Sequence, residues 1–126
     1  MTQTLPQLAE AIARAAYQVH EVMGTQQKPE DYAEALANHL AEGGLAVERR
    51  VAILLPYDGR RVDTGHVIDL VIERKVAVTI ATESPVGEDK RIDFSSHMQL
   101  GGYGLGVLLD FRATSMAEGM HMVKRA

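Results

Sequence analysis

Two apolar segments near the centre of the chain, residues 67–72 and 76–81, are separated only by Glu73, Arg74 and Lys75. Their β-branched content and their short length favour strands over helices. Because parallel strands need a crossover of a dozen or more residues, so short a charged link allows only a tight antiparallel turn. The sequence therefore predicts a pair of antiparallel strands at the centre of the chain.

The first part of the chain follows a helical period instead. Apolar side chains recur at helical spacing over residues 5–22, which predicts an amphipathic helix of roughly five turns that Gly24 ends. Pro29 suits the first turn of a second helix, because its missing N–H would be unpaired there in any case. Gly43 is expected to stop this second helix.

The remaining segments predict a mixed α/β architecture. Residues 46–57 are rich in Val, Ile and Leu, and the Asp58-Gly59 pair that follows is a strong hairpin signal. Three further elements are expected: a weakly patterned helix at 90–100, a strand at 105–111 and a short edge strand at 120–123. We therefore expect one α/β domain over residues 1–126, with a mixed central β-sheet flanked by helices.

Composition excludes several classes of site. The chain has no cysteine, which excludes disulfides, cysteine-ligated zinc, iron–sulfur clusters and thiol nucleophiles. No apolar run approaches the roughly 20 residues that span a bilayer, and no signal peptide is visible, so we expect a cytoplasmic protein without a membrane partner. The net charge of −4 argues against a dedicated nucleic-acid binder, because such affinity comes largely from Lys and Arg.

Four segments lie in a recognisable order along nearly the whole chain. They are 15–24, which contains Val19-His20 and ends in Gly24, then 32–36, then 67–71, which carries Asp69, and finally 105–111. In this order and spacing they resemble the GxxExxxR proteins, a branch of the PD-(D/E)XK nuclease superfamily. The resemblance implies a restriction-endonuclease-like core, and it places Asp69 at the metal-binding aspartate of the family.

The other positions that define this family differ in the chain. They are Gln26, Pro29, Ala33, Thr79, Ala81 and Asp93, where the family has Gly, Glu, Arg, Glu, Lys and Gln. In nucleases of this type two carboxylates hold Mg²⁺, and a lysine positions or activates the attacking water. Thr79 cannot replace the charge of a carboxylate, and Ala81 cannot transfer a proton. The resemblance therefore implies a degenerate site, and no metal cofactor is expected.

Asp69 has a structural and a functional interpretation. Strand alternation places it opposite Thr79, where a carboxylate needs a partner. The structural interpretation, which we favour, gives it Thr79, backbone N–H groups or His20 as partners; the functional one makes it a surviving metal ligand. For His20 itself, near the end of the first helix, we favour capping of helix carbonyls over a metal or acid–base role.

A relocated carboxylate would change this interpretation. Glu30 and Glu34 flank the missing second-helix glutamate, and either one near Asp69 would restore a pair of acids for Mg²⁺ or Mn²⁺. Acidic residues in the first turns of a helix more often serve its dipole, so this arrangement is the alternative.

Three functions follow from these observations. We expect a catalytically inactive nuclease-like domain that acts as a binding or assembly module, as a homodimer or with a partner that the sequence does not identify. The first alternative is a metal-dependent nuclease that uses Asp69 with Glu30 or Glu34. The second alternative is a module that binds nucleic acid without cutting it.

Overall fold

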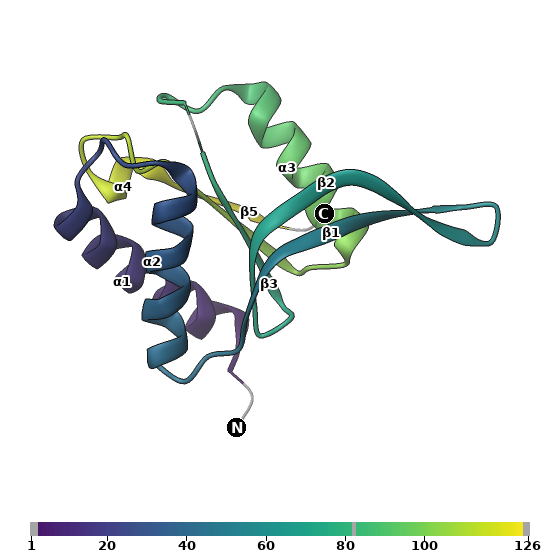
Figure 1. Cartoon of the computed structure of the whole chain (residues 1–126), viewed down its shortest axis with the longest axis horizontal. Coiled ribbons are helices and arrows are strands. Elements are labelled where there is room, and N and C mark those ends of the chain that lie inside the picture. Colours follow the sequence, from purple (N-terminus) through teal and green to yellow (C-terminus); the bar gives the residue numbers. More distant parts are fainter. Residues whose placement is uncertain (1–2, 82, 125–126) are drawn as a thin grey trace.

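The computed structural model describes residues 3–81 and 83–124, and it contains the predicted elements in the predicted order (Figure 1). The elements are α1 (Leu5–Met23), α2 (Pro29–Glu42), β1 (Val47–Tyr57), β2 (Arg60–Ile72), β3 (Val76–Ile80), α3 (Glu88–Gly101), β4 (Leu105–Leu109), α4 (Met116–Gly119) and β5 (Met120–Lys124). The short helix α4 was not predicted. In the described part of the chain, no helix is both long and apolar enough to cross a membrane.

The five strands form one mixed sheet in the order β1-β2-β3-β4-β5. The β1–β2, β2–β3 and β4–β5 pairs are antiparallel, whereas β3 and β4 are parallel. The parallel pair requires a crossover, and α3 provides it. The predicted α/β fold with a mixed central sheet is therefore confirmed.

Helices cover the two faces of the sheet unequally. On β3, Val76, Val78 and Ile80 pack in the cluster that includes α1 and α2, whereas Ala77, and Ala81 just after the strand, pack in the cluster that includes α3. This division follows from the alternation of side chains along a strand. Helix α3 buries only Phe94 and Met98, which explains its weak sequence pattern.

Gly106 allows α3 to pack closely on the sheet. A β-carbon at this position would lie 2.8 Å from the sulfur of Met98 and 2.8 Å from the ring of Phe94. Both side chains belong to α3, so a larger residue at position 106 would push the helix away from β4.

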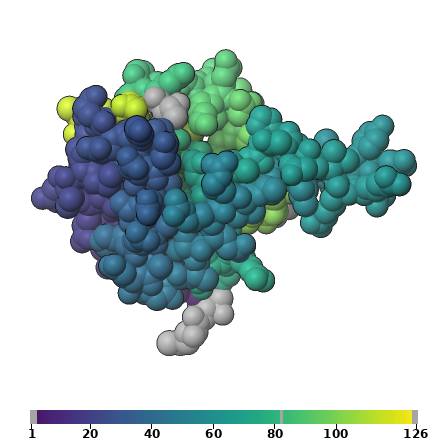
Figure 2. Space-filling model, viewed as in Figure 1, coloured from purple at the N-terminus to yellow at the C-terminus, as the bar shows by residue number. Residues whose placement is uncertain are grey.

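The β1–β2 hairpin extends away from the rest of the molecule (Figures 1 and 2). Asp58 and Gly59 both have positive φ angles, of 49° and 73°, as the predicted tight turn requires. Strand β2 begins at Arg60, although the sequence predicted a strand only from residue 67. The difference arises because residues 60–63 take their strand conformation from pairing with β1 and not from burial; the register then shifts before pairing resumes at Val67.

Candidate functional site

Asp69 lies where β2 separates from β3. The two strands pair only from Leu70 opposite Val78 to Ile72 opposite Val76. Beyond that point, the N–H of Ile80 donates to Asp69 Oδ2 at 2.8 Å, and Thr79 Oγ1 donates to the same oxygen at 3.2 Å. The carboxylate thus replaces a backbone acceptor of the sheet. The predicted hydrogen bonds to Thr79 and to a backbone donor are present.

The surroundings of Asp69 do not fit a magnesium site. Its contacts are two neutral donors, and Thr79 is 8% exposed with its hydroxyl directed at the carboxylate. Mg²⁺ requires several hard oxygen ligands in near-octahedral geometry. Among the described residues, no group of three or more His, Asp or Glu side chains is arranged to hold a metal ion.

The acidic residues of α2 lie outside this arrangement. Pro29 is the first residue of the helix, and Glu30 lies in its first turn. The helix buries Tyr32, Ala33, Leu36, Ala37 and Leu40 against the sheet, which leaves Glu30 and Glu34 exposed. Within residues 3–81 and 83–124, no hydrogen bond joins either glutamate to Asp69, whose partners come from β3 instead.

His20 has a different partner from either of those predicted. Its Nε2 lies 3.0 Å from the carbonyl oxygen of Ala113, in the segment that follows β4, and its ring centroid is 6.2 Å from that of Phe111. The carbonyl of His20 itself accepts from the N–H of Gly24. The predictions of an Asp69 partner and of a capping side chain were wrong, because the ring crosses to a distant segment. This contact of His20 connects the end of α1 to the segment that follows β4.

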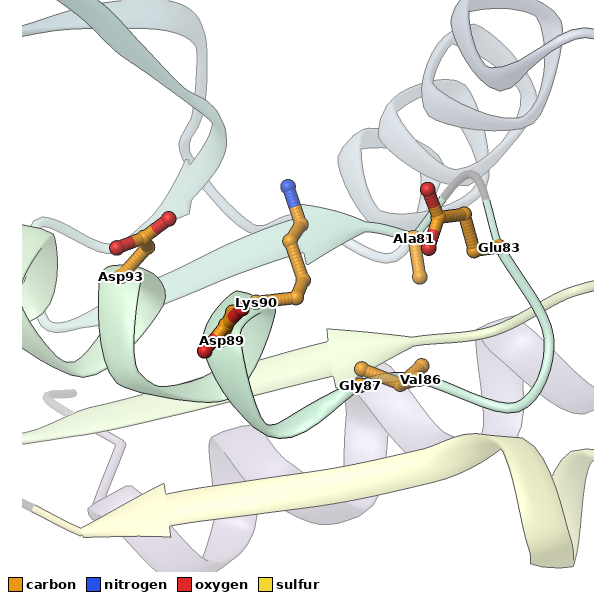
Figure 3. A pocket seen from close by; sticks show the side chains of 7 residues that line it. All are labelled: Ala81, Glu83, Val86, Gly87, Asp89, Lys90 and Asp93. Atoms are coloured by element: carbon orange, nitrogen blue, oxygen red, sulfur yellow. The ribbon is translucent and has the colours of Figure 1, made fainter.

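A pocket of about 300 Å³ opens beside Ala81 (Figure 3). Lys90, in the first turn of α3, extends into the space between Asp93 and Ala81. The other lining residues are Glu83, Val86, Gly87 and Asp89. A lysine from α3 therefore occupies the region beside the strand position where the resemblance expects one. The sequence did not predict this, because the approach of Lys90 depends on how α3 packs.

A second pocket, of about 450 Å³, adjoins the first, and Lys90 and Asp93 line both. It also contains Thr79 and two stacked histidines, His66 of β2 and His97 of α3, whose ring centroids are 5.1 Å apart. Burial lowers the pKa of His97, and the nearby His66 and Lys90 lower it further, whereas Asp93 partly opposes them. The sequence did not indicate this pair, since the two histidines have no ligand spacing.

The model of the PD-(D/E)XK nuclease superfamily matches residues 6–125 of the chain. The chain belongs to this superfamily. No curated protein and no solved structure matches it. In this PD-(D/E)XK domain Asp69 lies on β2, beside Thr79 and the end of β3.

Proposed function

We propose that this PD-(D/E)XK domain is a degenerate member of the GxxExxxR branch that binds a partner without hydrolysing phosphodiesters. The observation that carries the proposal is the pair of hydrogen bonds that Asp69 Oδ2 accepts from Thr79 Oγ1 and the Ile80 N–H. Both donors are neutral and belong to β3. Asp69 is thereby satisfied within the sheet and has no need of a cation.

The chemistry of cleavage supports this conclusion. A hydrolytic metal ion offsets charge on the phosphate and lowers the pKa of a bound water. One carboxylate beside a threonine supplies a single charged ligand, which is too few for a tightly held Mg²⁺ or Mn²⁺. Lys90 places a cation near Ala81, but a cation does not add to the ligands of a metal.

A binding role is supported by the cleft that remains. The two adjoining pockets lie between α3 and the part of the sheet formed by β2 and the end of β3, and they present Lys90, Asp93 and the His66–His97 pair. Concave surfaces with a few convergent polar groups are typical binding sites, and the fold itself does not require a reaction.

The direct test is incubation of the purified chain with Mg²⁺ or Mn²⁺ and with single- and double-stranded DNA and RNA. We expect no cleavage above that of a matched Asp69→Asn preparation, and no Mn²⁺ binding by calorimetry. An Asp63→Asn preparation controls for contaminating nuclease, because Asp63 lies on the same strand away from β3. Cleavage by the wild-type chain that Asp69→Asn abolishes and Asp63→Asn retains would contradict the proposal.

The cleavage assay, together with a gel shift, separates the two competing functions. An active nuclease that uses Glu30 or Glu34 would lose cleavage in Glu30→Gln or Glu34→Gln. A module that grips nucleic acid without cutting would shift DNA or RNA in a gel at low salt, and this affinity would fall steeply as salt is added. The net charge of −4 disfavours that outcome.

A further inference from the structure

The turn at the end of the β1–β2 hairpin consists of Asp58 and Gly59, and both residues are exposed. Figure 1 shows this turn at the far end of the hairpin, away from the helices. Among the residues that the structure describes, neither the Asp58 carboxylate nor the Gly59 N–H has a hydrogen-bond or ion-pair partner. A free carboxyl group is therefore followed directly by a free backbone N–H.

We propose that Asp58–Gly59 is a site of spontaneous backbone modification, at which Asp58 isomerises to isoaspartate through a cyclic imide. The backbone nitrogen of Gly59 attacks Cγ of Asp58 and forms a new C–N bond. The hydroxyl of the protonated carboxyl group leaves with the amide proton as water. Water then opens the imide at either carbonyl, which gives the original aspartyl bond or an isoaspartyl bond through Cγ. The reaction needs no oxidant, reductant or enzyme, and the inference does not depend on Asp69 or on the function of the cleft.

Gly59 gives the attacking nitrogen steric access to the carboxyl group. Asp58 is the one aspartate of the chain that precedes a glycine. A β-carbon at position 59 would have no atom within 4 Å beyond the adjoining residues, so the space around this residue is open. A two-stranded hairpin is only marginally stable, and its end opens more readily than the core. Such opening lets the turn reach the geometry in which the Gly59 nitrogen contacts Cγ of Asp58.

The other aspartates are held in ways that oppose the reaction. Three of them accept hydrogen bonds from backbone N–H groups: Asp63, Asp69 and Asp110. Another three lie in helices α2 and α3: Asp31, Asp89 and Asp93. A helical backbone is held in one conformation by its hydrogen bonds, so the following nitrogen cannot swing toward the side chain. Asp58 alone combines a free carboxylate, a turn backbone and a following glycine.

The isoaspartyl product would change the hairpin. Its backbone passes through Cβ and Cγ of residue 58, which adds one carbon atom to the link with Gly59. A two-residue hairpin turn requires positive φ at both residues, as Asp58 and Gly59 have, and the longer link does not preserve this geometry. We therefore expect pairing to be lost first between Tyr57 and Arg60, which face each other next to the turn. The inner half of β2, residues 68–72, should stay folded.

Peptide mapping tests the modification. The purified chain is kept for several weeks in mildly acidic buffer and is then digested with trypsin. Peptide 51–60 contains Asp58 as its single acidic residue, and peptide 62–74 contains Asp63 and Asp69 as internal controls. We expect a second form of peptide 51–60 to accumulate, with unchanged mass and with resistance to a protease that cleaves before aspartate. Peptide 62–74 should keep a single form.

Two variants separate imide chemistry from other causes. Asp58→Asn forms the same imide with loss of ammonia, so its peptide should convert faster and change in mass. Asp58→Glu keeps the charge but requires a larger ring, so it should give no isomer. If glutamate loosens the turn, the peptide bond becomes more accessible, and the absence of isomer still reports on ring size.

The outcomes that would overturn the inference are distinct from those that concern the cleft. One is a single form of wild-type peptide 51–60 at a time when Asp58→Asn has converted. Another is isomerisation in Asp58→Glu, or at Asp63, that equals isomerisation at Asp58. The separated isoaspartyl chain should exchange its hairpin amides several-fold faster than the unmodified chain; equal exchange would overturn the expected effect on the hairpin.

Discussion

The two halves of β2 have opposite surroundings. The inner half, residues 68–72, contains Ile68, Leu70, Val71 and Ile72, each at most 2% exposed. The outer half, residues 60–67, pairs with β1 alone and is exposed except for the half-buried Thr64. Asp69 stands in the inner half, at the point where pairing with β3 stops. One strand therefore contributes both to the core and to a surface suited to contact with other molecules.

The largest expected difference between these halves is in packing. Leu70→Ala removes a fully buried side chain and should lower the free energy of unfolding by roughly 2–5 kcal/mol. Val62→Ala in the outer half should change it by less than about 0.5 kcal/mol. Urea unfolding, at a concentration where the chain is monomeric, measures both. Equal effects would show that the outer half is packed as tightly as the inner one.

The next effect concerns the carboxylate where the halves meet. Asp69→Ala leaves the Ile80 N–H and the Thr79 hydroxyl without their acceptor, which should cost roughly 1–3 kcal/mol of unfolding free energy. Thr79→Val removes only the longer of the two hydrogen bonds, so the free energy of unfolding should fall by less than in Asp69→Ala. If Asp69→Ala were as stable as the wild type, the structural role of Asp69 would be refuted.

A smaller effect on the free energy of unfolding is expected at Thr64, in the β1–β2 hairpin. Thr64 Oγ1 donates to the carbonyl of Ile53 at 2.8 Å, and this bond joins the outer half of β2 to β1. Thr64→Val keeps the shape and removes the donor, so unfolding free energy should fall by about 0.5–1.5 kcal/mol. Hydrogen exchange of the hairpin amides, faster in the variant, would localise the loss; unchanged exchange would exclude a role for this bond.

The smallest expected effect is a dependence of stability on pH, which arises at His97 of α3, next to the outer half of β2. Because the pKa of His97 is lowered in the folded chain, the unfolded chain binds more protons as pH falls below the ordinary value of 6.5. The contribution of His97 to the free energy of unfolding is therefore complete above pH 6.5, and it is lost as pH falls from 6.5 toward the lowered pKa of His97. His121 shifts in the same direction, so the comparison must be with His97→Gln. Stability measured at about pH 7.5 and about pH 5.5 should fall less in the variant than in the wild type.

The sequence predicted the elements whose signals are local. The three-residue link 73–75 specified the β2–β3 turn and therefore placed Thr79 opposite Asp69. Asp58-Gly59 specified the hairpin turn. The outer half of β2 was not predicted, because residues 60–66 lack the apolar alternation of a half-buried strand, and residues 60–63 take their conformation from β1.

The parts of the site that depend on tertiary packing could not be predicted. His20 contacts the carbonyl of Ala113, far along the chain, and His66 stacks on His97 across a strand and a helix. Lys90 reaches the pocket beside Ala81 only because α3 packs over the sheet. No spacing rule links these residues, since each pair is joined by the fold and not by a shared element.

The single parallel pair in the described sheet, β3–β4, also bears on how the chain folds. Strands β1, β2 and β3 follow one another through tight turns, so their contacts are local and close at little entropic cost. Strand β4 joins β3 only after the segment that contains α3 has looped back across the sheet. Because non-local pairing slows folding, addition of β4 and β5 to a preformed three-stranded meander is the expected late step.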